Sequence, residues 1–390
     1  MMSPRSILSV IVATALIFTS SGPILGRSSA AFAASSRQSR EDYVVTRFGA
    51  RCDGVADDGA AFQSALDSAG AGCRAEGAFV VAGFAAVIIP DGARCRINRE
   101  LVDAKSDCVG IASNAGATLD FSAMREGTAL TLKHLAYGAY AGNVADFAHL
   151  EIIGPGSSSN TVGIASETPN TVYSQLNIHG FGHGYEVHSG SWLNHFENSS
   201  ISYSGVALFC GKGLKDAGEQ ISFEAGALFN NGAAVKNNSC EFNITDSSLD
   251  ESAGPAVVNG GGSTRLTSDH IEYVNNTASA ALVVTNEACN AWGSITMEGG
   301  QIQFDKTPPQ ALASNDGGPG PCGGGGWGSY IRLNNVFLGN IPMDAKGAPI
   351  VSGTNSIQIA VCHATSGAGG GAMGNVRNIG RPYPPNPSQC

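Results

Sequence analysis

The sequence predicts an all-β solenoid, and three observations favour it. One apolar position recurs at separations between 21 residues, from Leu228 to Leu249, and 35 residues, from Ile302 to Phe337. The composition includes 52 glycines and only 14% charged residues, and Gly and Asn break short β-branched runs throughout. Only one stretch has the periodicity of a convincing amphipathic helix. A repeat of about twenty-odd residues suits stacked coils better than one globular core.

The first 33 residues have the form of a secretory signal peptide. Arg5 supplies the positive start, and apolar residues 7–18 form a core too short to span a membrane. Removing residues 1–33 takes Arg5 and Arg27 from the 22 basic residues, which leaves 20 basic against 32 acidic residues. We therefore expect a secreted or periplasmic protein that is not embedded in a membrane. An acidic protein also does not suit nucleic-acid binding, which depends on phosphate neutralisation.

Residues 34–75 are expected to form an N-terminal cap segment that contains a short helix. Asp57 or Asp58 would be the N-cap, with a carboxylate close to free helix N–H groups. An apolar stripe at three- and four-residue spacing predicts a helix of about three turns. The stripe consists of Phe62, Ala65, Leu66 and Ala69.

The run from Phe48 to Ala69, FGARCDGVADDGAAFQSALDSA, resembles the opening segment of the secreted pectate-lyase-like proteins, a group related to glycoside hydrolase family 28. In that family an FGA-x-x-DG-x-x-DD run precedes a short helix that covers the N-terminal end of a single-stranded right-handed parallel β-helix. An uncovered end would expose core and strand edges. The resemblance implies the same fold here, with the β-helix at 76–365 and an extended Gly/Pro-rich tail at 366–390.

The chain contains ten cysteines, and the even count with an export signal predicts disulfides. Cys52 and Cys73 flank the expected helix. A bridge between them, or from one of them to Cys95 or Cys108, would fasten the cap to the coil stack. No cysteine or histidine cluster has zinc spacing, so we expect no structural metal.

The recurring apolar position also identifies the residues that face outward. The residue after each apolar one should point away from the core, because side chains alternate along a strand. Equivalent positions on neighbouring coils should lie about 4.8 Å apart. The aligned apolar residues are Ile152, Ile178, Ile201, Leu228, Leu249, Ile271, Ile302 and Phe337. The outward column is then Ile153, His179, Ser202, Phe229, Asp250, Glu272, Gln303 and Leu338.

Two acids are neighbours in this column, Asp250 and Glu272, and we expect them to be catalytic. Like charges at this spacing repel and raise one pKa, and glycosidases need one protonated carboxyl and one ionised carboxylate. Asp246, Glu219 and Glu224 are candidates to assist. A spacing of about 5 Å favours a retaining reaction, whereas Asp246 with Glu272 would be a wider, inverting pair.

A second resemblance covers GEQISF (218–223), SSLDE (247–251) and DHIE (269–272). Similar strands occur on successive coils of bacterial and phage β-helix proteins, including tailspike-type depolymerases that cleave surface polysaccharides. Those proteins usually have an aromatic residue after SLD, where this chain has Glu251. The resemblance implies a polysaccharide as the partner, no cofactor, and a monomer or a homotrimer.

Four side chains are candidates for substrate binding. Aromatic ring faces pack against the C–H surfaces of sugars, and Trp192, Phe229 and Tyr273 lie near the same strands. His270 precedes Glu272 by two residues, and we expect it either to face the opposite way or to lie at a corner.

Three functions remain open from the sequence. The first is a glycoside hydrolase that uses the paired carboxylates. The second is a polysaccharide lyase, which would use Ca²⁺ and an Arg or Lys base. Only Lys236 and Arg265 lie between Glu219 and Glu272, so an obvious base is missing. The third is a β-helix that binds a surface polymer without cleaving it.

Overall fold

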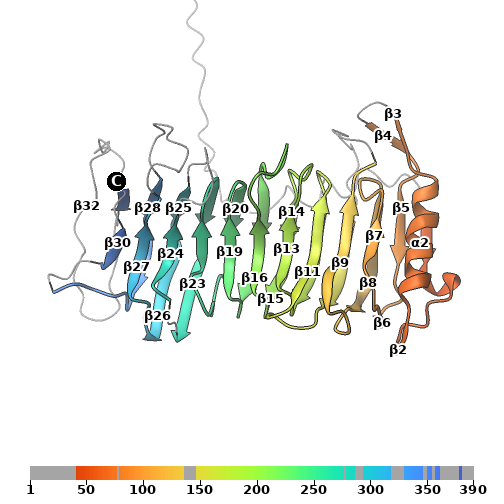
Figure 1. Ribbon diagram of the computed structural model, residues 1–390, viewed down its shortest axis with the longest axis horizontal. Helices are drawn as coiled ribbons and strands as arrows, with labels where there is room; N and C mark the ends of the chain where they lie inside the picture. The colour runs from red at the N-terminus through yellow and green to blue at the C-terminus, as the bar shows by residue number, and fades with distance from the viewer. Residues whose placement is uncertain are drawn as a thin grey trace, which may run out of the picture. The chain divides into compact units, whose positions relative to one another are not determined.

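The chain folds into a right-handed parallel β-helix whose coils stack from the helix Gly59–Ala71 (α2) at one end to the strand Val351–Gly353 (β30) at the other (Figure 1). The structure is a computed structural model that describes residues 41–76, 79–135, 146–275, 278–285, 293–317, 329–345, 349–353, 356–360 and 377–379. The expected signal peptide, four of the ten cysteines and all of the expected tail except residues 377–379 lie outside these residues. Within these ranges no helix is both long and apolar enough to cross a bilayer.

Each coil passes through three faces, and the strands on each face pair in parallel with those of the next coil. Three strands, Val109–Asp120 (β8), Asp146–Ile153 (β10) and Val172–His179 (β12), run through both the first and the second face. The first face also contains Glu41–Val44 (β1), Ala85–Ile88 (β5), His195–Glu197 (β14), Ile221–Glu224 (β17), Glu241–Thr245 (β20), Ser263–Thr267 (β22), Ser294–Glu298 (β25), Tyr330–Asn334 (β28) and Ser356–Ala360 (β31), with Arg377–Ile379 (β32) antiparallel to β31.

The second and third faces complete each coil. The second face contains Asp53–Asp57 (β2), Arg94–Arg96 (β6), Ser200–Ser202 (β15), Ala227–Phe229 (β18), His270–Asn275 (β23), Gln301–Thr307 (β26) and Phe337–Gly339 (β29). The third face contains Leu101–Asp103 (β7), Glu126–Lys133 (β9), Asn160–Glu167 (β11), His183–Val187 (β13), Val206–Cys210 (β16), Ala233–Asn237 (β19), Val257–Asn259 (β21), Ala280–Val284 (β24), Ala311–Asn315 (β27) and Val351–Gly353 (β30). Arg74–Glu76 (β3) and Phe79–Ala82 (β4) form a separate antiparallel pair.

A left-handed backbone position makes the bend between the first and second faces on successive coils. Residues with positive φ are rare outside glycine, and they turn the chain sharply. Here the same position is occupied in turn by His149, Gln175, Asn198, Ala225, Asp246 and Ser268, with φ between 48° and 59°.

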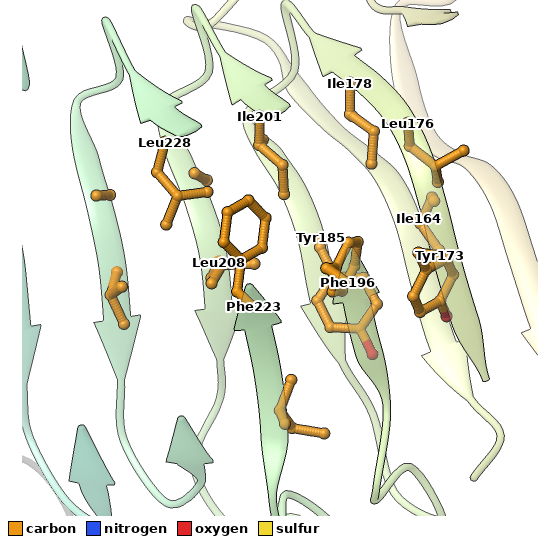
Figure 2. Packing of buried hydrophobic residues seen from close by; sticks show 14 of the residues in the cluster. Ile164, Tyr173, Leu176, Ile178, Tyr185, Phe196, Ile201, Leu208, Phe223 and Leu228 are labelled. Atoms are coloured by element: carbon orange, nitrogen blue, oxygen red, sulfur yellow. The ribbon is translucent and has the colours of Figure 1, made fainter. Parts of the chain in front are cut away.

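Ladders of matching side chains fill the inside of the coils (Figure 2). Ile178, Ile201 and Leu228 lie in register on the second face and are fully buried. On the first face the ring of Phe196 stacks on Tyr173 with centroids 4.3 Å apart. Burial of each such side chain contributes about 1.5–3 kcal/mol, so the repeated apolar position stabilises every coil.

The predicted cap helix is confirmed as Gly59–Ala71 (α2), and its predicted apolar stripe is buried. The Oδ1 atom of Asp57 accepts the Gly59 N–H at 3.1 Å, so Asp57 supplies the expected carboxylate contact at the helix start. Gln63 covers the free edge of β7: its Nε2 donates to the Val102 carbonyl at 2.8 Å, and its Oε1 accepts the Val102 N–H at 2.9 Å. The helix therefore satisfies backbone groups that an end coil would leave open.

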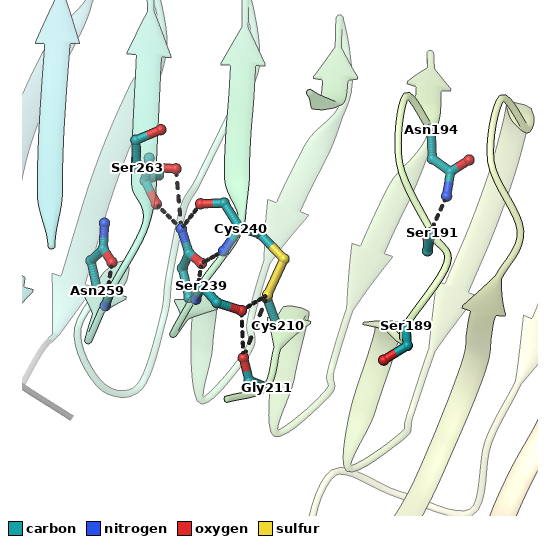
Figure 3. The surroundings of a disulfide bond; sticks show 12 residues. Ser189, Ser191, Asn194, Cys210, Gly211, Ser239, Cys240, Asn259 and Ser263 are labelled. Carbon is teal, nitrogen blue, oxygen red and sulfur yellow. Dashed lines mark hydrogen bonds between the residues drawn. A yellow bond between two sulfur atoms is a disulfide. The ribbon is translucent and has the colours of Figure 1, made fainter. Parts of the chain in front are cut away.

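All six described cysteines are in disulfides. Cys52–Cys95 and Cys73–Cys108 tie the segments on either side of α2 to the first coils, as two of the bridges left open by the sequence would do. Cys210–Cys240 joins the end of β16 to the residue before β20 on the next coil (Figure 3). The parallel pairing of β1 with β5 and of β2 with β6 places the start of the stack inside residues 34–75.

Candidate active site

The outward positions of the second face follow the order of the coils. Ser248 pairs with His270 of the next coil, so Asp250 lies beside Glu272 two residues further along. The predicted adjacency of Asp250 and Glu272 is therefore confirmed. The preceding positions of the same column are Ile153, His179, Ser202 and Phe229.

The predicted column is wrong at its last position. Ile302 lies beside Leu338, not beside Phe337, so Gln303 faces Gly339. Leu338 is fully within the core, at 2% exposure. Both Phe337 and Leu338 are apolar, which left two possible alignments, and a shift of one residue turns a side chain to the opposite face.

The Asp250 carboxylate is held by three neighbouring groups. Its Oδ1 atom accepts the backbone N–H of Glu272 at 2.7 Å. Its Oδ2 atom accepts the hydroxyl of Ser248 and lies 3.2 Å from Nδ1 of His270. A carboxylate has about four lone-pair directions, so these contacts fix the orientation of Asp250 and leave one direction for a substrate atom or water.

His270 stands between the two carboxyl groups. Its Nδ1 is 3.2 Å from Asp250 Oδ2, and its Nε2 is 3.5 Å from Glu272 Oε2. The expectation that His270 faces the opposite way or lies at a corner is wrong, because residues two apart on a strand share a face. The side chains of Asp250, His270 and Glu272 are between 22% and 30% exposed, so solvent reaches all three.

The pKa of Glu272 is raised above its ordinary value. Partial burial of the side chain raises this pKa most, and the charge of Asp305 raises it further. His270 opposes these effects, and Asp250 adds a smaller increase. A carboxyl group with a raised pKa keeps its proton to higher pH, which is the property a general acid needs.

Two polar residues near the pair were missed by the sequence analysis. Ser248 donates to Asp250, and the exposed Asp305 accepts the Gln303 Nε2–H at 3.0 Å on the coil after Glu272. Ser248 precedes Asp250 by two residues and Asp305 follows Gln303 by two. Extending the alternation by one step in each direction would have found both.

Aromatic side chains lie on the side of Asp250 that faces the N-terminal coils. Phe229 is the neighbour of Asp250 in the column, as the alignment predicted, and it is half-buried. Tyr203, which the sequence analysis did not select, is 57% exposed and has its ring centroid 6.0 Å from that of Phe229, at an interplanar angle of 73°.

Three of the selected acids lie apart from the pair. Asp246 is exposed at the bend between the first and second faces. Glu224 ends β17 on the first face, where its Oε2 is 3.8 Å from Nε2 of His195. Glu219 precedes β17, at the far end of a first-face strand from that bend. Among the described residues no hydrogen bond or ion pair joins any of the three acids to the pair.

The structure also separates two of the selected aromatic residues from the pair. Tyr273 is fully buried and stacks on Phe304 with centroids 5.3 Å apart, and its burial raises the pKa of the phenol. We therefore assign Tyr273 to the core rather than to a substrate surface. Trp192 lies in the turn that leads from the third face to the first, where its carbonyl accepts the Asn170 N–H at 2.9 Å.

The same cluster has the composition of a metal site. Asp250, His270 and Glu272 each offer one ligand atom, and the three atoms lie within 4.8 Å of one another. A donor set with an imidazole suits a transition metal better than Ca²⁺, which takes oxygen ligands. The other such group contains Cys52 and Cys95, whose sulfurs are joined in a disulfide and so are not free thiolates.

No protein-family model matches the sequence, and no curated protein sequence is significantly similar to it. Two solved structures are each similar to 82% of the chain. One is ORF18 of Geobacillus virus E2, with a TM-score of 0.57 and 11% identity, and the chain covers 61% of its length. The other is the enzymatically active domain of tailspike protein 4 of bacteriophage CBA120, with a TM-score of 0.59 and 15% identity, and the chain covers 44% of it. At these identities the likeness shows that the chain shares the fold of a phage tailspike domain.

Proposed function

We propose that this protein is a secreted carbohydrate-active enzyme that hydrolyses glycosidic bonds of an extracellular or cell-surface polysaccharide. The observation that carries the proposal is the pairing of Asp250 and Glu272 on adjacent coils. The raised pKa of Glu272 suits the general-acid role in such a carboxyl pair. The fold shared with a tailspike's enzymatically active domain supports the proposal by analogy.

In the proposed reaction Glu272 donates its proton to the glycosidic oxygen as the bond from that oxygen to the anomeric carbon breaks. An Asp250 oxygen then forms a bond to the anomeric carbon. Water, deprotonated by Glu272, releases the sugar in the second step. One oxygen atom of each carboxyl lies within 4.8 Å of one of the other, which favours the retaining geometry of about 5 Å over the wider inverting one. His270 lies between the two carboxyl groups and positions Asp250 through its Nδ1.

A polysaccharide lyase acting on a uronate polymer with Ca²⁺ is the alternative. Its base would be a lysine or an arginine, and the two nearest candidates in sequence lie on other faces. Arg265 is exposed on the first face, and Lys236 lies on the third. The hydrolase proposal needs no metal, so dependence on Ca²⁺ would belong to the lyase.

The proposed setting is an oxidising compartment outside the cytoplasm. Three disulfides within the described residues support this, because such bonds persist in secreted and periplasmic proteins. The partner is a polysaccharide, and the protein acts as a monomer or a homotrimer.

One panel of soluble polysaccharides separates the possible reactions. Hydrolysis gives new reducing ends without ultraviolet absorption, and its rate falls at high pH as Glu272 loses its proton. A lyase would give ultraviolet-absorbing products whose formation stops on chelation. Retention in a polysaccharide gel without any new ends would indicate a protein that only binds. Either of the last two results would contradict the proposal.

A further inference from the structure

Tyr203 and Phe229 make an aromatic surface directly beside the proposed catalytic pair. They lie on consecutive coils, with Asp250 on the coil after Phe229 and Glu272 on the next. Coils are about 4.8 Å apart, so the aromatic pair begins one coil from Asp250. Ring faces of this kind pack against the C–H surface of a sugar, and a tyrosine hydroxyl can hydrogen-bond to it.

The backbone at Tyr203 is unfavourable for an aromatic residue. Tyr203 has a φ of 48°, in the turn that ends the second-face strand. The equivalent positions on the coils before and after it are Gly180 and Asn230, the two residue types that adopt this conformation with least strain. Local preference for this conformation therefore does not explain a tyrosine here.

The charge of the second face restricts what can bind along it. Two outward columns run through this face, one through Asp250 and Glu272 and one two residues earlier on each coil. From Glu151 to Gly339 neither contains a lysine or an arginine among its described residues, and Arg94 and Arg96 lie in them two coils before Glu151. The columns contain acids instead, namely Glu151, Asp250 and Glu272, and Asp305 lies on the coil after Glu272. Such a surface repels a polyanion, and this part of the columns offers no lysine or arginine to its carboxylates.

We infer that Tyr203 and Phe229 form a sugar-binding subsite adjoining the cleavage site, and that the polysaccharide bound there is uncharged. The inference rests on the proposed function and adds two things to it, the class of substrate and the direction of the chain. The polysaccharide runs along the coil stack, from the aromatic pair on the N-terminal side to Glu272.

The test is affinity electrophoresis in gels that contain dextran, laminarin, galactomannan or polygalacturonate. All variants are made in a parent protein that carries Glu272→Gln, so that the gel polymer is not degraded. Tyr203→Asn removes the ring and fits the turn, Tyr203→Phe keeps the ring, and Tyr330→Asn removes an exposed tyrosine from the first face as the control. We expect a neutral polymer to retard the parent. Tyr203→Asn should weaken this binding about tenfold, and the other two variants should stay within about twofold.

Each result decides the inference. Equal retardation of Tyr203→Asn and its parent would overturn the subsite, as would no retardation by any polymer. Tighter binding to polygalacturonate than to the neutral polymers would overturn the substrate class. The proposed function fails separately. If Tyr203→Asn loses binding while Asp250→Asn and Glu272→Gln still cleave at the normal rate, the subsite stands and the catalytic assignment does not.

Discussion

Asp103, at the end of β7 under the cap helix, is a buried acid whose ionisation should govern the stability of the N-terminal coils. Its side chain is 2% exposed, and its Oδ1 accepts the Lys105 N–H at 3.1 Å. Burial raises the pKa of Asp103 to about 8, the hydrogen bond from Lys105 opposes this, and the charges of Asp107 and Asp67 add to it. The folded protein therefore holds a proton on Asp103 at neutral pH.

The sign and size of the effect follow from this pKa. A group whose pKa is higher in the folded state stabilises the fold fully below its unfolded pKa, here 3.8, and this stabilisation is lost as pH rises toward the folded value of about 8. One such proton gives a slope of about 1.4 kcal/mol per pH unit, so the free energy of unfolding falls by about 3 kcal/mol from pH 5 to pH 7.

Urea unfolding at pH 5, 6 and 7 tests this directly. Asp103→Asn cannot titrate and retains an acceptor for the Lys105 N–H. Between pH 5 and pH 7 its free energy of unfolding should therefore fall by about 3 kcal/mol less than that of the unsubstituted protein. Asp42→Asn, which changes an exposed acid, should follow the unsubstituted protein. Parallel pH dependences for the protein and Asp103→Asn would refute the reasoning.

The same unfolding assay tests three further substitutions. Asp269→Asn should lower the free energy of unfolding by about 1–3 kcal/mol, because both carboxylate oxygens accept backbone N–H groups and an amide replaces one acceptor with a donor. An unchanged urea midpoint would contradict this. Phe196→Ala should lower the free energy of unfolding by about 3–5 kcal/mol, because it leaves a cavity among the stacked aromatic side chains. A loss below about 1 kcal/mol would contradict this and would show that neighbouring side chains fill the cavity. Changing Cys210 and Cys240 together to serine should lower the free energy of unfolding by about 4 kcal/mol for a sequence separation of 30 residues, and a reductant should then destabilise this variant less than the unsubstituted protein, because only Cys52–Cys95 and Cys73–Cys108 remain among the described disulfides.

Much of the scaffold could be predicted because it repeats. The cap helix carries its apolar stripe within thirteen residues, and local periodicity is enough to recognise it. The coil repeat places Asp250 beside Glu272 because successive coils return a strand to the same position. One well-aligned apolar residue per coil therefore determines which neighbours face outward.

The remainder depends on contacts that no local pattern encodes. The alignment was wrong by one residue at Leu338 because Phe337 and Leu338 are both apolar and either could occupy the inward position. Only the pairing of Leu338 with Ile302 decides between them. Tyr203 was missed because it lies in a turn, one residue beyond the strand position that was read. The disulfide partners of Cys52 and Cys73 depend on how the cap lies against the first coils.

The most direct test of the account is the rate at which reducing ends are released from the best neutral polysaccharide of the panel. Asp250→Asn and Glu272→Gln should each lower this rate at least about 100-fold while binding to the polymer is kept, because each removes one of the two groups that act on the bond. Glu241→Gln, an exposed glutamate on the first face, should keep the normal rate. Retention of more than half of the normal rate by both site variants would contradict the assignment of Asp250 and Glu272 as the catalytic pair.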